Sequence, residues 1–175
     1  MGWFYSALPL RLSARGLGEI AIALGTGLLI PGTGYIVTKG KFDPLFLLFA
    51  MPFIMYGFTL SLSLEAPDME DDIRVGKNNL VVRKGRGFTF SVIGALSFLA
   101  TLSFLTYAKG VAPTTIIDFR VVVMISCIPL VVGLVGFFRR PEKRDVINRL
   151  SAAYIAALFL LNVLLNIYFI ILLWV

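Results

Sequence analysis

One short segment of this chain concentrates its acidic residues. Five of the ten fall within eight consecutive positions: Glu65, Asp68, Glu70, Asp71 and Asp72. If the apolar segment before them continues as a helix past Pro67, Asp68 and Asp72 lie four residues apart on one face. Like charges at that spacing repel each other, so a bound cation would stabilise the pair. Because Mg²⁺ prefers carboxylate oxygens and leaves positions for substrate phosphates, the spacing predicts a site for Mg²⁺ and a diphosphate.

Basic residues follow the acidic ones directly. Lys77, just beyond the turn residue Gly76, would offer a point charge to phosphate oxygens, and Arg74 or Arg83 would add forked donors. The alternative interpretation is a solvated, mixed-charge loop that only fixes how the chain crosses a membrane. Composition alone leaves both interpretations open.

The residue inventory excludes several kinds of site. The chain has no histidine, which excludes histidine-based catalysis and histidine-ligated zinc. Its one cysteine, Cys127, lies within an apolar stretch, which excludes an internal disulfide and a cysteine-based metal centre. We expect Cys127 to serve in packing.

The elements that position this segment are membrane spans. Of the 175 residues, 58% are hydrophobic and 15% are charged, and the mean hydropathy is +0.90. Five apolar stretches are long enough to cross a bilayer as helices: 17–38, 44–64, 88–108, 117–138 and 150–175. The sequence therefore predicts an all-α, multi-span transmembrane bundle of five helices, with residues 1–175 forming one membrane domain. The long connection at 65–87 is the predicted functional loop.

Basic residues alternate between the two ends of the predicted bundle. Twelve of the 16 precede the first span or lie in the loops after the second and fourth spans, and four lie on the opposite side. The positive-inside rule then predicts a cytoplasmic N-terminus, cytoplasmic basic loops and an external C-terminus. Topology accounts for the net charge of +6, so a nucleic-acid partner is not expected.

Two spans carry further patterns. The first contains two overlapping pairs of small residues four apart, Ala21 with Gly25 and Ala23 with Gly27, which favour close helix packing in lipid. The last contains Asn162 and Asn166 on one face. This asparagine pair would either form hydrogen bonds between helices or contact a polar headgroup in a cavity.

Two segments carry a resemblance to a known family. Residues 68–85, DMEDDIRVGKNNLVVRKG, resemble the second aspartate motif of the UbiA-type intramembrane prenyltransferases. Upstream, residues 5–12 and 15–19 look like the family's tyrosine-containing segment and the loop after it. Their form is most similar to the menaquinone-branch enzymes, the 1,4-dihydroxy-2-naphthoate polyprenyltransferases. The motif follows the second span here and the sixth span in the family, so the chain would correspond to the C-terminal five of nine helices.

The resemblance implies Mg²⁺-dependent transfer of a polyprenyl group from its diphosphate to an aromatic acceptor in quinone biosynthesis. Asp68 and Asp72 would be the catalytic metal ligands, and Lys77 and Arg74 would contact the diphosphate. Four residues are weaker candidates for the substrate pocket: Tyr5, Arg11, Asn162 and Asn166. The expected partners are polyprenyl diphosphate, the aromatic acceptor and membrane lipid, in a bacterial or archaeal cell membrane.

The chain also departs from the family pattern. The family's first, Asn/Asp-rich motif is absent, and Asn79 stands where many members have threonine. We therefore expect this chain alone to be inactive and a separate N-terminal half to be a candidate partner. The alternatives are a non-catalytic membrane subunit or relic, and a small membrane transporter component. Transport sites usually place ionisable residues at mid-bilayer, whereas these spans are nearly free of charge.

Overall fold

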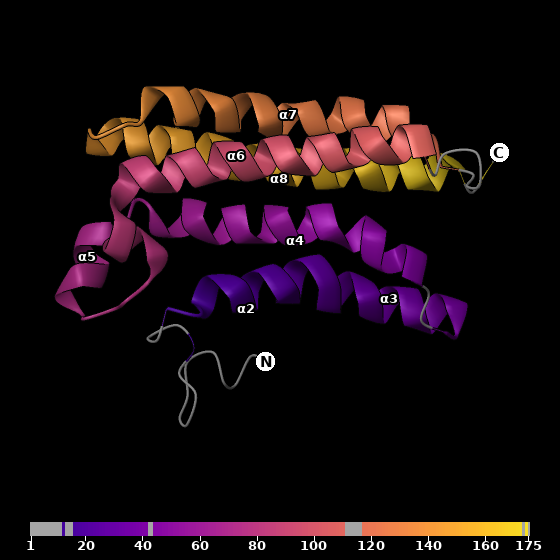
Figure 1. Cartoon of the computed structure of the whole chain (residues 1–175), viewed down its shortest axis with the longest axis horizontal. Coiled ribbons are helices and arrows are strands. Elements are labelled where there is room, and N and C mark those ends of the chain that lie inside the picture. The colour runs from indigo at the N-terminus through magenta and orange to yellow at the C-terminus, as the bar shows by residue number, and fades with distance from the viewer. Residues whose placement is uncertain (1–11, 13–15, 42–43, 111–116, 173, 175) are drawn as a thin grey trace.

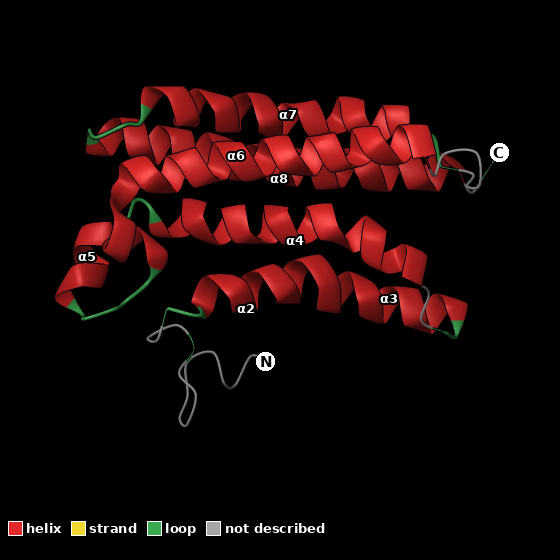
Figure 2. Cartoon of the chain, viewed as in Figure 1, coloured by secondary structure: helices red, strands yellow, loops and turns green. Residues whose placement is uncertain are grey.

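The chain forms a bundle of long helices that lie side by side (Figure 1). The computed structural model describes residues 12, 16–41, 44–110, 117–172 and 174, and regular structure in these ranges is helical throughout (Figure 2). The elements are α2 (Gly18–Leu24), η1 (Gly25–Leu29), α3 (Ile30–Lys39), α4 (Pro44–Glu65), α5 (Met69–Arg74), α6 (Leu80–Gly110), α7 (Phe119–Arg139) and α8 (Arg144–Leu172). Five helical segments in the described ranges are long and apolar enough to cross a membrane, which confirms the predicted fold class.

Helix α4 occupies the middle of the bundle. It contacts α2, η1 and α3 on one side and α6 and α8 on the other, while α7 packs against α6 and α8. A hydrogen-bonded cluster joins three of these helices: the Tyr154 hydroxyl lies 2.6 Å from Ser97 Oγ and donates to Thr59 Oγ1 at 3.0 Å. Such bonds between side chains of different helices stabilise association where lipid offers no polar partner.

The first span is not a uniform α-helix. Its middle turn, η1, is a π-helix in which the amide of Ile30 donates to the carbonyl of Gly25, five residues back. Pro31 follows immediately and has no N–H to donate, so the α-helical ladder cannot continue unchanged through this point. The span therefore comprises α2, η1 and α3 in succession.

One of the two predicted small-residue pairs lies at a helix contact. A Cβ on Gly27 would lie 2.4 Å from the backbone nitrogen of Ile54, and one on Gly57 would lie 3.0 Å from Cα of Ala23. A Cβ on Gly25 would meet nothing within 4 Å. The Ala23–Gly27 pair therefore lets the first span touch the backbone of α4, while Gly25 lies away from that contact.

Helix α6 begins at Leu80, eight residues before the predicted third span. The side chain of Asn79 causes the early start, because its Oδ1 accepts a 2.9 Å bond from the amide of Val82 and so caps the helix. The helix is interrupted at Gly85, which has a φ of 78° and a ψ of 167°. The predicted functional loop, 65–87, therefore contains α5 and the first turns of α6. Helix α8 likewise begins earlier than expected, at Arg144.

Candidate functional site

The acidic segment forms a sharp corner at one end of the bundle, where α5 projects (Figure 1). Helix α4 ends at Glu65, a turn follows, and α5 begins at Met69, so the helix does not continue past Pro67 as the sequence interpretation supposed. Asp68 and Asp72 still lie one helical turn apart, because the amide of Asp72 donates to the carbonyl of Asp68 at 2.9 Å.

The two aspartates have different environments. Asp72 is 4% exposed; its Oδ1 accepts a bond from Lys77 Nζ at 2.5 Å, and its Oδ2 accepts one from Asn79 Nδ2 at 2.7 Å. Asp68 is exposed. The charge on Asp72 is therefore neutralised beneath the surface by charge-assisted bonds, whereas Asp68 faces outward.

Asn79 links the acidic corner to α6. It is 3% exposed, and while its amide nitrogen donates to Asp72, its amide oxygen caps α6. Both ends of the carboxamide are thus used. The result is that the position of Asp72 is fixed relative to the start of the next membrane helix.

Residues 16–19 and 78–80, which belong to the segments that carry the family resemblance, meet at this end of the bundle. Glu19, 2% exposed at the start of the first span, accepts a hydrogen bond from the amide of Leu80. Gly16 has a φ of 72°, and a Cβ there would lie 2.4 Å from the carbonyl oxygen of Asn78. No role was assigned to Glu19 in the sequence analysis. A carboxylate inside an apolar span nevertheless indicates that the residue has a specific partner or function.

Arg86 holds the corner between α4 and α5. Its Nε donates to the carbonyl of Ala66 at 2.9 Å, its Nη2 donates to the carbonyl of Pro67 at 3.3 Å, and both Nη atoms donate to the carboxylate of Glu70. These bonds lower the pKa of Glu70. The guanidinium therefore satisfies carbonyls left over at the end of α4 and fixes α5 at the same time. Sequence reasoning missed Arg86, which is 16 positions from Glu70.

The predicted diphosphate contacts lie on the solvent side of this corner. The Lys77 side chain is 45% exposed, and Arg74, 77% exposed, pairs with Asp71 at 3.0 Å. Arg144, from the start of α8, lies 4.0 Å from the same Asp71 carboxylate. Within the part of the chain that the structure describes, no group of three or more His, Cys, Asp or Glu side chains is arranged to hold a metal ion.

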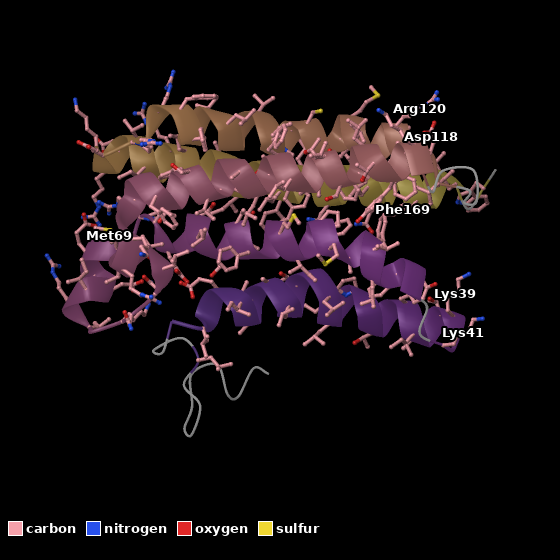
Figure 3. All side chains as sticks on the ribbon, viewed as in Figure 1. Lys39, Lys41, Met69, Asp118, Arg120 and Phe169 are labelled. Carbon is pink, nitrogen blue, oxygen red and sulfur yellow. The ribbon has the colours of Figure 1, made fainter. Side chains whose placement is uncertain are left out.

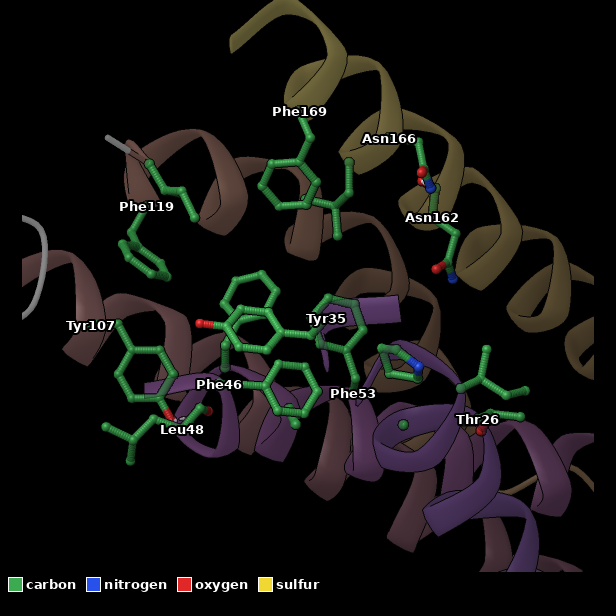
Figure 4. A pocket seen from close by; sticks show the side chains of 17 residues that line it. Thr26, Tyr35, Phe46, Leu48, Phe53, Tyr107, Phe119, Asn162, Asn166 and Phe169 are labelled. Carbon is green, nitrogen blue, oxygen red and sulfur yellow. Dashed lines mark hydrogen bonds between the residues drawn. The ribbon is translucent and has the colours of Figure 1, made fainter. Parts of the chain in front are cut away.

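The remaining predicted pocket residues are not at this corner. Tyr5 and Arg11 lie outside the described residues. Asn162 and Asn166 line a cavity of about 630 Å³ toward the other end of the bundle (Figure 4). In Figure 3, Met69 of the acidic corner and Phe169 of the cavity wall lie at opposite ends of the molecule. The structure thus separates the two asparagines from the aspartates.

Comparison with known proteins gives one match. Residues 1–163 match the family model described as the UbiA prenyltransferase family. The matched range covers residues 16–19 and 78–80, which meet at the acidic corner, as well as most of α8. No curated protein and no solved structure matches the chain.

Proposed function

Because the chain belongs to the UbiA prenyltransferase family, we propose that its acidic corner binds the diphosphate of a polyprenyl donor during transfer to an aromatic acceptor in the membrane. Family membership supports a prenyltransferase activity in general. The observation that supports this particular site is the set of bonds that fixes buried Asp72 to Lys77 and Asn79, beside the exposed Lys77 and Arg74 side chains. This places an ordered carboxylate next to cations that can reach phosphate.

The carboxylates of the corner fit the requirements of Mg²⁺, which proteins bind through one or two carboxylates together with water and substrate phosphates. Asp68 is exposed, and its carboxylate oxygens are ligands of the required type. The carboxylate of Asp72 offers about four lone-pair positions, of which Lys77 and Asn79 use two. We propose that Asp68 and Asp72 hold Mg²⁺, which would neutralise charge on the diphosphate.

Lys77 and Arg74 are the proposed diphosphate contacts. The Lys77 ammonium is partly exposed and lies 2.5 Å from the buried carboxylate of Asp72, and the Arg74 guanidinium is exposed at the end of α5. Fixed positive charge at this position would stabilise the negative charge that develops on the departing diphosphate. Membrane-embedded walls would keep water from the prenyl group during transfer.

The orientation and acceptor are parts of the same proposal. The basic residues gathered at the end of the bundle that carries α5 support a cytoplasmic location for the acidic corner. The similarity of residues 5–19 to the menaquinone-branch enzymes supports 1,4-dihydroxy-2-naphthoate as the acceptor and menaquinone biosynthesis as the pathway.

Diphosphate binding is the most direct test, because it does not require this chain to complete catalysis alone. The purified chain in nanodiscs is titrated with radiolabelled geranylgeranyl diphosphate, with Mg²⁺ and with a chelator. We expect saturable binding that needs Mg²⁺, and we expect Asp72→Asn and Asp68→Asn each to weaken it at least tenfold. Asp71→Asn is the matched control, because Asp71 is adjacent and exposed and is not part of the proposed metal site.

Transfer is then measured in membranes that contain the chain, with 1,4-dihydroxy-2-naphthoate and 4-hydroxybenzoate as competing acceptors. Binding that is equal with Mg²⁺ and with chelator would overturn the proposed metal site. The absence of any saturable diphosphate binding would favour a non-catalytic membrane subunit. Preferential prenylation of 4-hydroxybenzoate would overturn the proposed acceptor alone.

A further inference from the structure

The cavity at the end opposite the acidic corner is lined mainly by apolar side chains, many of them aromatic. Its volume is about 630 Å³, and its walls come from the first span, α4, α8 and the facing ends of α6 and α7 (Figure 4). Seven aromatic side chains of the described residues line it: Tyr35, Phe46, Phe49, Phe53, Tyr107, Phe119 and Phe169. Ala50 in its wall precedes Glu65 by 15 residues on α4, about 22 Å along the helix axis. The cavity is therefore separate from the proposed diphosphate site.

Two asparagines in its wall have their amide nitrogens already bonded. Asn162 Nδ2 donates to the carbonyl of Leu158 at 2.9 Å, and Asn166 Nδ2 donates to the carbonyl of Asn162 at 2.8 Å. A backbone carbonyl can only accept, so the nitrogen of each carboxamide must face its own helix. Each amide oxygen, together with the second N–H of the same amide, is therefore left to interact with an occupant of the cavity.

Two hydroxyl groups in the wall follow the same pattern. Thr26 Oγ1 donates to the carbonyl of Ile22 at 2.8 Å, and the Tyr107 hydroxyl donates to the carbonyl of Leu48 at 2.9 Å. Among the described residues that line the cavity, five have polar side chains, and four of these donate a hydrogen bond to a backbone carbonyl and retain an acceptor. The cavity is complementary to a molecule that brings hydrogen-bond donors.

From this arrangement we propose that the cavity is a second binding site, for a lipid-soluble phenol. Its ring would pack against the aromatic side chains, and its hydroxyl would donate to one of the asparagine oxygens. Asn162 and Asn166 are exposed on a membrane-spanning helix, and hydrocarbon chains cannot supply a donor to them. A phenol hydroxyl satisfies one of these acceptors, whereas a quinone or an ether of the same shape offers them no donor.

Binding of a neutral ligand tests this site without diphosphate, Mg²⁺ or catalysis, so its result is independent of the proposed function. The chain in nanodiscs is titrated with tritiated 2-farnesylphenol and with its methyl ether, which keeps the ring and tail and lacks the donor. Because a hydrogen bond contributes about 0.5–1.5 kcal/mol net, we expect the phenol to bind about two- to tenfold more tightly than the ether.

The asparagine variants locate the site. We expect Asn162→Leu combined with Asn166→Leu to remove the preference for the phenol while leaving ether binding within about twofold. Asn148→Leu is the control, because Asn148 is exposed on the same helix and does not line the cavity. Equal binding of phenol and ether by the unmodified chain would overturn the proposal whether or not the variants fold. A preference for the phenol that persists in the double variant would also overturn it.

Discussion

The two ends of this bundle are stabilised by different kinds of interaction. At the acidic corner, charged side chains bond to one another and to backbone carbonyls, as Arg86 does with Glu70 and Ala66. At the aromatic cavity, side chains pack against one another, and the polar groups bond chiefly to backbone carbonyls. The corner should therefore respond to loss of charge and to acid, whereas the cavity end should respond to changes in side-chain volume.

The largest effect is expected from volume at the cavity end. Gly27→Ala places a Cβ 2.4 Å from the backbone nitrogen of Ile54, and backbone cannot rotate away as a side chain can. We expect it to lower the free energy of unfolding by about 3 kcal/mol or more. Gly25→Ala is the matched control, because its Cβ meets nothing within 4 Å and alanine favours the helix by about 1 kcal/mol.

Thermal unfolding of both variants in detergent micelles measures the difference. If Gly25→Ala were as destabilising as Gly27→Ala, the contact between the first span and α4 would not control stability at this end. The pair of variants therefore tests packing without altering any charge.

The second largest effect is expected from buried charge at the corner. Asp72→Ala leaves the buried amide of Asn79 and the Lys77 ammonium without their shared carboxylate, which should cost about 3 kcal/mol. Asp71→Ala removes only exposed ion pairs and should cost less than about 1 kcal/mol. Chemical denaturation in micelles compares the two. Equal losses would show that burial of Asp72 does not distinguish it from its neighbour.

The sequence predicted the spans better than it predicted the corner. Hydropathy identified all five spans, because lipid requires a continuous apolar helix of fixed length. Hydropathy placed the start of α6 eight residues late. The helix begins at Leu80, where the side chain of Asn79 caps it, and hydropathy detects only the part of a helix that is apolar. Spacing alone also could not show that α4 stops before Pro67.

The contacts that build the corner connect residues that no short motif joins. Glu19 accepts a hydrogen bond from the amide of Leu80, 61 residues away, and Arg86, which follows the interruption of α6 at Gly85, bonds to Glu70. Small-residue spacing predicted that the first span packs closely, but which of its two pairs faces α4 depends on how the helix is rotated. The family resemblance identified residues 15–19 and 68–85 as important, but it did not predict which of their residues contact one another.

A smaller effect is expected from Arg86. Arg86→Gln removes the paired bonds to Glu70 and at least one of the bonds to the carbonyls of Ala66 and Pro67, which should cost about 2 kcal/mol locally. Hydrogen exchange should rise in residues 66–74 and stay unchanged in the α8 residues that line the cavity. Arg83→Gln is the control, because Arg83 is exposed at the start of the same helix. Faster exchange at both ends would contradict the separation between them.

The smallest effect is expected from acid. Hydrogen bonds from Arg86 lower the pKa of Glu70 below its usual value of 4.5, so the pairing stabilises the corner above about pH 4.5 and is lost as pH falls through the lowered pKa. Hydrogen exchange of residues 66–74, corrected for the intrinsic effect of pH, should therefore increase in acid. Glu70→Gln should raise exchange at neutral pH and remove most of this dependence, while the cavity end should not change. A variant that keeps the full acid response would contradict its assignment to Glu70.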